Sequence, residues 1–404
     1  MSVEIGARIA QFRIQRGLTQ ATLATHMDLA PDQLCKIEKG RRRPEITELA
    51  AASEVLGVSL RELIGVADEG KLALAARVGE GATLDILRPM RVRARQLIEV
   101  DHVLTEMVGL RTPEPTASAT AARARGAQLA RLPARGRTAH ESIGEEFADY
   151  VRELLQIGTE PITDLPNLIE ARFGVDVALF PFPDGQDGHK PDGLCVHTRD
   201  TRVIIANSLF TPGHVRFTLA HELAHHLFGD PREVITESPD YIRDSSPIEQ
   251  RANAFAGAFL MPRAGVIAEC NRLENANQVS PAVLRHLVIY FDASLAAMIY
   301  RLNVLKLLSF DEGQRLRRAG ISRLPDALTG PVTTAIEPTA EVRPPTRLAL
   351  AALDGFSERR IGLNPLATLQ QRENDDDFYN EITAQLDELV DFADDEAELD
   401  WRDS

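Results

Sequence analysis

The chain has 404 residues, enough for two or three domains, and 44% of them are hydrophobic, as in an ordinary folded protein. No apolar run approaches the length that spans a bilayer, and the first residues lack the pattern of a secretory signal. Three widely spaced cysteines, Cys35, Cys195 and Cys270, favour buried thiols in a reducing compartment. We therefore expect a cytoplasmic protein that does not bind a membrane.

The net charge of −15 is concentrated at the C-terminal end. Residues 373–404 hold fourteen acidic residues against one basic residue, Arg402, so the rest of the chain carries only −2. Acidity of the whole chain therefore does not argue against nucleic-acid binding. One helical pattern lies within these residues, and we expect them to form a partly helical acidic tail.

The spacing of apolar residues predicts helices along most of the chain. Residues 1–66 are expected to form a compact helical domain, and 67–110 a helical connector with a break at Pro89. Residues 111–140 are rich in Ala, Ser, Thr and Arg, a composition that predicts a flexible or weakly helical linker. Residues 311–372 are expected to form an irregular or linker region.

Between these regions helical patterns flank a group of short β-rich runs. The runs cover 175–180, 194–197 and 203–206, and helices are expected again from about 247 to 308. We therefore predict an α+β domain over 141–310, mainly α with a small antiparallel sheet. An edge strand of such a sheet can hold an extended peptide.

The most informative motif of the chain is His221-Glu222-Leu223-Ala224-His225, which lies in an apolar run with helical spacing. Residues four apart share a helix face, so both imidazoles can reach one metal ion. Glu222 is placed beside them to take a proton from a metal-activated water, as in zinc-dependent peptidases. The alternative is an amphipathic helix that carries two surface histidines by chance.

A catalytic zinc needs a third protein ligand. A third histidine at the metzincin position is excluded, because Phe228 and Pro231 occupy the residues that this pattern requires. Acidic candidates follow the motif, and they are Asp230, Glu233, Glu237, Asp240, Asp244 and Glu249.

A second signature surrounds Glu249 and reads Glu249-Gln250-Arg251-Ala252-Asn253-Ala254-Phe255-Ala256, running on to Phe259-Leu260-Met261-Pro262. Together with Phe217-Thr218-Leu219-Ala220 before the histidines, it resembles the ImmA/IrrE family of metallopeptidases over roughly 140–310. The resemblance implies a zincin-like domain whose metal ligands are His221, His225 and Glu249. It further implies Zn²⁺, with Mn²⁺ as the alternative ion, Glu222 as general base, and a helix-turn-helix repressor as the protein substrate.

Four polar residues near the motif have less defined roles. His226 is expected to point away from the ligand face of the helix. His197 or His214 could stabilise a transition state, and the sequence does not choose between them. Asn253 is expected to form a local hydrogen bond that orients its helix.

The N-terminal region carries a second resemblance. The stretches Leu18-Thr19-Gln20-Ala21-Thr22-Leu23-Ala24 and Leu34-Cys35-Lys36-Ile37-Glu38-Lys39-Gly40-Arg41-Arg42-Arg43-Pro44 resemble the Cro/repressor-type (XRE) helix-turn-helix family over residues 5 to about 64. The resemblance implies double-stranded DNA as a partner, with the helix at about 31–39 in the major groove. By position, the side chains expected near DNA are Gln20, Asp32, Gln33, Lys36, Lys39, Arg41, Arg42 and Arg43. Ala30 stands where a Ser or Thr cap is usual, which predicts a weakened helix start.

These patterns together predict a DNA-binding regulatory metallopeptidase that cuts a partner transcriptional regulator. One alternative is a transcriptional regulator in which the peptidase-like domain is a sensor or dimerisation module. Another is an antitoxin-like partner whose acidic tail binds a basic protein or covers its own DNA-binding domain. The oligomeric state stays open between a monomer and a homodimer.

Overall fold

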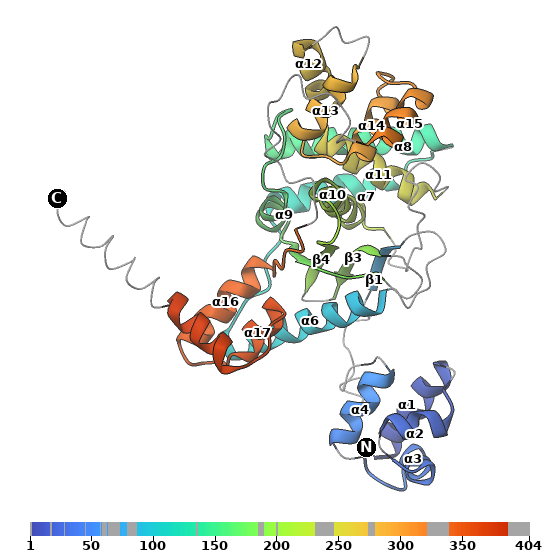
Figure 1. Ribbon diagram of the computed structural model, residues 1–404, viewed down its shortest axis with the longest axis vertical. Coiled ribbons are helices and arrows are strands. Elements are labelled where there is room, and N and C mark those ends of the chain that lie inside the picture. Colours follow the sequence, from blue (N-terminus) through green and yellow to red (C-terminus); the bar gives the residue numbers. More distant parts are fainter. Residues whose placement is uncertain are drawn as a thin grey trace, which may run out of the picture. The chain divides into compact units, whose positions relative to one another are not determined.

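The computed structural model describes residues 2–16, 18–27, 29–44, 46–56, 58, 63, 73–78, 87–134, 136–184, 190–198, 201–230, 246–273, 279–320 and 339–386. The chain divides into two compact units, Met1–Ala73 and Leu74–Ser404 (Figure 1). Each unit has its own hydrophobic core.

Over residues 1–66, the described part of the smaller unit is all-α, as predicted. Its helices are α1 (Ser2–Gln15), α2 (Gln20–His26), α3 (Pro31–Glu38) and α4 (Ile46–Leu56). Leu23, Leu34 and Ile37 are fully buried in its core. Gly6 lets α1 approach α3, because a Cβ at this position would lie 1.9 Å from the carbonyl oxygen of Ile37. The spacing of apolar residues therefore identified the packed faces of these short helices.

The start of α3 lacks a side-chain cap at Ala30, as predicted, but gains a hydrogen bond from Gln33. Ala30 has no side chain to cap the helix, but Oε1 of Gln33 accepts a hydrogen bond from the Ala30 N–H at 3.0 Å. This contact is one half of a capping box, supplied from the third residue of the helix. Gln33 therefore satisfies the N–H of Ala30, whereas the acceptor that a Ser or Thr hydroxyl would offer to the first turn is absent.

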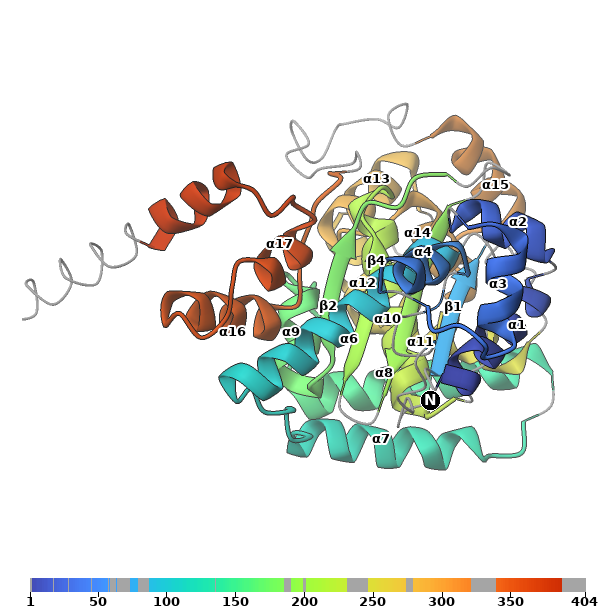
Figure 2. The same cartoon turned by 90° about the horizontal axis from the view of Figure 1, so that it is seen from below.

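The larger unit is built on a four-stranded sheet with the order β1-β3-β4-β2 (Figure 2). The strands are β1 (Ala73–Val78), β2 (Asp176–Phe180), β3 (Pro191–His197) and β4 (Arg202–Asn207). The three predicted β-rich runs are confirmed as β2, β3 and β4. The predicted antiparallel pairing holds for β3 with β4 but is wrong for β2, which pairs with β4 in parallel. The sheet is mixed because the chain reverses twice between β2 and β4.

The strand β1 contradicts a further prediction, because the sequence predicted a helical connector over 67–110. Part of that range is helical, as α6 (Arg88–Val108), whereas β1 is an edge strand beside β3. Ala-rich segments favour helix over strand, so tertiary pairing overrides local preference here.

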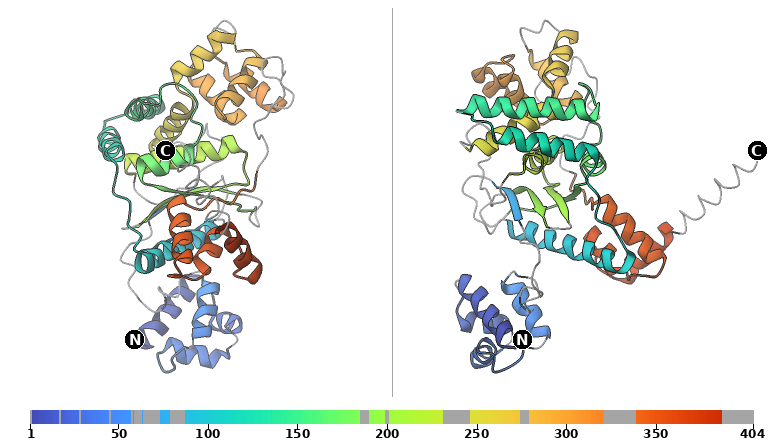
Figure 3. Two further views of the ribbon diagram at one scale, coloured as in Figure 1. Left: turned by 90° about the vertical axis from the view of Figure 1, so that its left-hand side faces the viewer. Right: turned by 180° about the vertical axis from the view of Figure 1, so that it is seen from behind.

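Helices cover both faces of the sheet (Figure 3). α6 packs on one face, and α10 (Pro212–Phe228) packs on the other. Beyond α10 lie α7 (Ala117–Ala130), α8 (Arg137–Leu155) and α11 (Pro247–Leu260), and α9 (Leu165–Phe173) packs against β2, α7 and α10. The core between these layers contains stacked or tilted aromatic rings, including Phe147, Phe228, Phe255 and Phe259.

The remaining helices of this unit's predicted α+β domain are α12 (Arg263–Leu273), α13 (Pro281–Tyr290) and α14 (Leu295–Val304). Among the described residues, no single helix has the length and apolarity to cross a membrane. α13 and α14 meet that criterion only when taken together, and they are bent by 111° at the break between them.

The prediction of a flexible linker over 111–140 is wrong for α7, which is part of the core. Ala119, Ala122 and Leu129 are buried, and a Cβ at Gly126 would lie 2.3 Å from the carbonyl oxygen of Leu227 in α10. The small residues that suggested a linker instead allow two helices to pack closely. Large apolar side chains are scarce in α7 because there is no room for them.

The irregular region predicted over 311–372 is also wrong in part, because its described residues form three helices. They are α15 (Phe310–Ala319), α16 (Thr346–Ser357) and α17 (Asn364–Gln370), and α16 and α17 pack against α6. Residues 321–338 lie outside the described residues. Residues 376–386 of the predicted acidic tail are helical, with Phe378 and Ile382 buried, whereas 387–404 lie outside the described residues.

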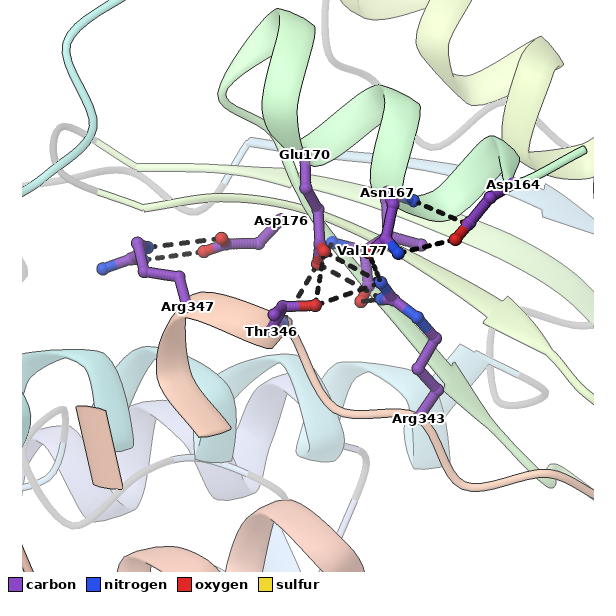
Figure 4. A network of polar contacts seen from close by, with 8 residues as sticks. All are labelled: Asp164, Asn167, Glu170, Asp176, Val177, Arg343, Thr346 and Arg347. Carbon is purple, nitrogen blue, oxygen red and sulfur yellow. Dashed lines mark hydrogen bonds and ion pairs between the residues drawn. The ribbon is translucent and has the colours of Figure 1, made fainter. Parts of the chain in front are cut away.

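A network of ion pairs attaches α16 to the sheet and to α9 (Figure 4). Arg343 donates to Glu170 at 2.8 Å, while Arg347 lies 2.7 Å from Asp176 and 2.8 Å from Asp101. Burial raises the pKa of the Asp176 carboxyl, although Arg347 opposes this effect. The C-terminal helices therefore belong to the same folded unit as the sheet.

Candidate metal centre and nucleic-acid interface

α10 places the histidine motif inside the protein. The helix has Pro212 in its first turn and ends at Gly229, whose φ of 69° is the left-handed conformation that favours glycine. Every residue from 215 to 228 is buried, and His221 and His225 are only 1% and 8% exposed. The alternative of a surface helix that carries two exposed histidines is therefore excluded.

Glu249 meets the two histidines from the first turn of α11. One carboxylate oxygen lies 3.1 Å from Nε2 of His221 and the other 3.3 Å from Nε2 of His225. The two Nε2 atoms lie 2.9 Å apart. The structure thus brings together the three side chains that the sequence predicted as metal ligands, and the potential ligand atoms all lie within 4.8 Å of one another.

Two further side chains fix the orientation of the imidazoles. Nδ1 of His221 lies 3.0 Å from Oδ1 of Asn253, and Nδ1 of His225 lies 2.9 Å from Oδ2 of Asp230. Because both oxygens accept hydrogen bonds, each Nδ1 is the donor, and each Nε2 faces Glu249. Asp230 also pairs with Arg251, whose guanidinium lies 4.8 Å from the ring centroid of Phe228. This arrangement is typical of histidines that bind a metal.

Asp230 is the supporting residue whose position sequence reasoning missed. It was one of six candidates for the third ligand, but it contacts Nδ1 of His225, on the opposite side of the ring from Glu249. Glu233, Glu237, Asp240 and Asp244 lie outside the described residues. Asn253 forms a hydrogen bond as expected, and its partner is His221.

The electrostatic field at the candidate metal centre favours a positive charge. Burial lowers the pKa of His225, whereas the charge of Glu249 and the hydrogen bond with Asp230 raise it, and the net pKa lies well above the usual value.

The donor set fits a tetrahedral metal ion. A zinc ion about 2.0–2.1 Å from each ligand atom separates those atoms by about 3.4 Å. The two Nε2 atoms lie 2.9 Å apart, and each has a different oxygen of Glu249 at 3.1 or 3.3 Å, so the spacing of the donors is close to this value. Two imidazole nitrogens and one carboxylate leave a fourth position for water or substrate.

Glu222 lies on the same helix as the histidines and is 1% exposed. β3 passes directly over it, because a Cβ at Gly193 would lie 3.6 Å from Cγ of Glu222 and 2.5 Å from Cγ2 of Thr218. Glycine at this position therefore permits the close approach of strand and helix.

The other histidines lie outside the ligand group. His226 is buried and its Nδ1 lies 2.7 Å from Nε2 of His197 on β3, so it faces the sheet. His214 pairs with Asp192 at 3.4 Å and stacks on Phe210.

In the smaller unit, Gln20 and Arg42 are held by acidic partners. Nε2 of Gln20 donates to Glu38, which is also bonded to Arg13, and these contacts join α2 to α3. Arg42 forms two hydrogen bonds with Glu48, at 2.7 and 3.0 Å. Both side chains therefore support the fold of this unit.

The remaining predicted DNA contacts lie on α3 and just after it. Asp32 and Lys36 form an exposed pair at 3.0 Å, and the hydrogen bond and charge of Lys36 lower the pKa of Asp32. Gln33 caps the helix, as described above. Lys39, Arg41 and Arg43 are exposed. These lysines and arginines form a basic group at the C-terminal end of α3 and in the following turn.

Two family models match the chain. Residues 9–63 match the helix-turn-helix model, and residues 170–303 match the IrrE N-terminal-like domain, peptidase M78. The second match begins within α9 and includes the whole candidate metal centre.

Two curated proteins are similar to the chain. The HTH-type transcriptional regulator PrpR of Mycobacterium tuberculosis is 25% identical over an alignment of 279 residues that covers 64% of this chain and 56% of that protein. The chain thus spans just over half the length of that relative. The HTH-type transcriptional regulator y4dJ of Sinorhizobium fredii is 34% identical over 65 residues, 16% of this chain and 84% of that protein.

Solved structures give a much weaker likeness. PlcR of Bacillus thuringiensis, solved with the peptide PapR7 and DNA, has a TM-score of 0.16 at 9% identity, over 78% of this chain and 99% of that one. The apo form of the competence regulator ComR of Streptococcus vestibularis has a TM-score of 0.16 at 12% identity, over 88% of this chain and 98% of that one.

The sequence signatures, the helices that carry them and the two model matches agree. Residues 9–63 belong to the helix-turn-helix family and residues 170–303 to the IrrE N-terminal-like family, and the chain is a fusion of these two domains.

Proposed function

We propose that the chain is a DNA-binding transcriptional regulator whose peptidase M78 domain hydrolyses a peptide bond in a partner regulator. The observation that carries this proposal is the buried group of His221, His225 and Glu249, with Glu222 on the same helix. The relatives named as transcriptional regulators support the regulatory role.

In this proposal His221, His225 and Glu249 hold the metal ion, for which Zn²⁺ is the first candidate and Mn²⁺ the alternative. When bound, such an ion polarises the scissile carbonyl and makes a water molecule more acidic. Asn253 and Asp230 keep the proton on Nδ1 of each histidine, so that Nε2 is available as a ligand.

Glu222 is the general base of the proposed reaction. Its carboxylate takes a proton from the attacking water and then delivers that proton to the leaving amine. Its burial beside β3 keeps bulk water away from the carboxylate. A low-dielectric position of this kind strengthens its interaction with the metal and with a developing charge.

For DNA binding, Lys36, Lys39, Arg41 and Arg43 are the proposed contacts of α3 and the following turn. All four are exposed cations, of which Lys36 pairs with Asp32 at the surface, whereas Gln20, Gln33 and Arg42 have contacts that support the fold of the domain. Asp32 repels phosphate and can accept a hydrogen bond from a cytosine amine. We therefore expect modest affinity from a single copy of the domain.

The experiment that tests this function replaces Glu222 by Gln in cells that carry a reporter and the helix-turn-helix repressor encoded nearest to this gene. We expect the variant to retain metal and DNA binding while the repressor stays intact and the reporter stays off. Glu153→Gln, at an exposed glutamate of α8, is the matched control and should behave as the wild type. Equal repressor integrity with wild type and Glu222→Gln would instead support a sensor role for the domain.

A further inference from the structure

β1 is the edge strand of the sheet and pairs with β3. The sheet order is β1-β3-β4-β2, and five of the six residues of β1 belong to the larger unit (Figure 1). In sequence, β1 follows the residues matched to the helix-turn-helix family. The segment after the DNA-binding domain therefore completes the sheet of the peptidase M78 domain.

β3, the neighbour of β1, runs alongside the helix of the candidate metal centre. At one end of β3, Gly193 contacts the turn of α10 that carries Thr218 and Glu222. At the other end, His197 bonds to His226, one residue after the second histidine of the motif. An extended peptide that pairs with the edge of β3 therefore continues the sheet and runs close to Glu222.

Main-chain pairing at a sheet edge does not depend on the sequence of the added strand. A peptide from a partner protein and residues 73–78 would thus use the same N–H and C=O groups of β3. Only one of the two strands can therefore pair with β3 at a time.

We propose that residues 73–78 are an internal competitor for the peptide-binding edge of β3, so that an extended peptide must displace β1 to reach the candidate centre. This inference rests on the proposed function, since it concerns access to the same site.

The composition of β1 suits a strand that can be displaced. Three of its six residues, Ala73, Ala75 and Ala76, are alanines, which favour helices and are depleted in strands. An edge strand is paired on one side only. The helix preference of these alanines, which led to the predicted helical connector, therefore weakens the pairing of β1 with β3. Covalent attachment offsets this weakness, because it gives β1 a high effective concentration at the edge.

The test measures binding of a fluorescein-labelled synthetic peptide with the sequence of residues 71–80. Two full-length, zinc-loaded proteins are compared by fluorescence anisotropy, Glu222→Gln alone and Glu222→Gln with residues 73–78 replaced by a Gly-Ser segment of equal length. Glu222→Gln prevents cleavage of the probe during the measurement. We expect the replaced protein to bind the peptide at least tenfold more tightly.

The matched control is the same peptide with proline at the positions of the adjacent residues Ala75 and Ala76, so that one of the two lost N–H groups faces β3 in either register. It lacks two main-chain N–H groups and should bind neither protein. Equal affinity of the unmodified peptide for the two proteins would overturn the inference.

Hydrogen–deuterium exchange on the Glu222→Gln protein with β1 intact gives a second measurement that does not need the replaced segment to fold. A saturating amount of the peptide should speed up amide exchange in residues 73–78 and leave β3 protected. Unchanged protection of residues 73–78 at saturation would also overturn the inference. Failure of the proposed peptidase function would be recognised differently, as the absence of Glu222-dependent cleavage of a partner. It would change neither the peptide affinities nor the exchange rates measured here.

Discussion

Oδ1 of Asn253 lies 3.0 Å from Nδ1 of His221, so a residue of α11 fixes the ring of a proposed ligand on α10. Asp230 has the same relationship to His225 from just beyond the end of α10. α10, α11 and the residue just after α10 thus supply the proposed ligands and the groups that orient them.

Asn253→Ala should weaken zinc binding by about 10–100-fold, because Nδ1 of His221 loses the acceptor that sets its tautomer. Competition with a chromophoric chelator measures the affinity. Asn271→Ala removes an exposed asparagine of α12 and is the matched control, for which we expect wild-type affinity. Equal zinc affinity of Asn253→Ala and wild type would refute the role assigned to Asn253.

Arg251→Met should lower the free energy of unfolding by about 3 kcal/mol, because it removes the guanidinium that pairs with the buried carboxylate of Asp230. It also removes the guanidinium from the ring of Phe228. Urea denaturation of the zinc-free proteins measures the change. Arg360→Met, at an exposed ion pair with Glu358, is the control and should change stability by less than about 1 kcal/mol. A similar small change in Arg251→Met would contradict the structure of this pair.

Gly126→Ala should destabilise the protein by about 1–3 kcal/mol, since the added Cβ would lie 2.3 Å from the carbonyl oxygen of Leu227. In an isolated helix the same change stabilises, so the sign of the effect distinguishes a packed helix from a linker. Ala124→Ser, on the exposed face of α7, serves as the control. A gain in thermal stability for Gly126→Ala would show that α7 does not pack on α10.

Arg41→Ala and Arg43→Ala should each reduce the salt dependence of DNA binding, by about 0.9 in the slope of log K against log salt. Arg42→Ala should act differently, because Arg42 is bonded to Glu48 within the domain. We expect it to lower the thermal stability of residues 1–73 and to leave the salt slope unchanged. Titrations of a labelled operator at several salt concentrations separate the two effects. A loss of slope in Arg42→Ala equal to that of its neighbours would contradict this division.

The proposed site could be predicted from sequence because its chemistry is encoded in short segments. His221 and His225 are one helical turn apart, so their shared face follows from helix geometry alone. Glu249 comes from a distant segment, and only the family signature identified it. The position of Asp230 could not be predicted in this way, because it depends on where Gly229 ends α10 and turns the chain back towards His225.

The errors in the predicted fold have a common physical cause. Small residues in α7 and β1 carry little information about periodicity, so composition suggested a linker in one case and a helix in the other. The outcome in each was decided by contacts with distant segments, namely Leu227 for Gly126 and β3 for β1. The parallel pairing of β2 with β4 likewise depends on the path of the chain between the strands.

The most direct measurement of the central proposal uses purified, zinc-loaded protein and a purified helix-turn-helix repressor encoded beside it. Intact mass spectrometry follows the repressor with wild type, with Glu222→Gln and with the control Glu153→Gln. We predict two fragments whose masses sum to that of the repressor plus one water, formed by wild type and Glu153→Gln but not by Glu222→Gln. An intact repressor with all three proteins, or equal cleavage by Glu222→Gln, would contradict the proposal.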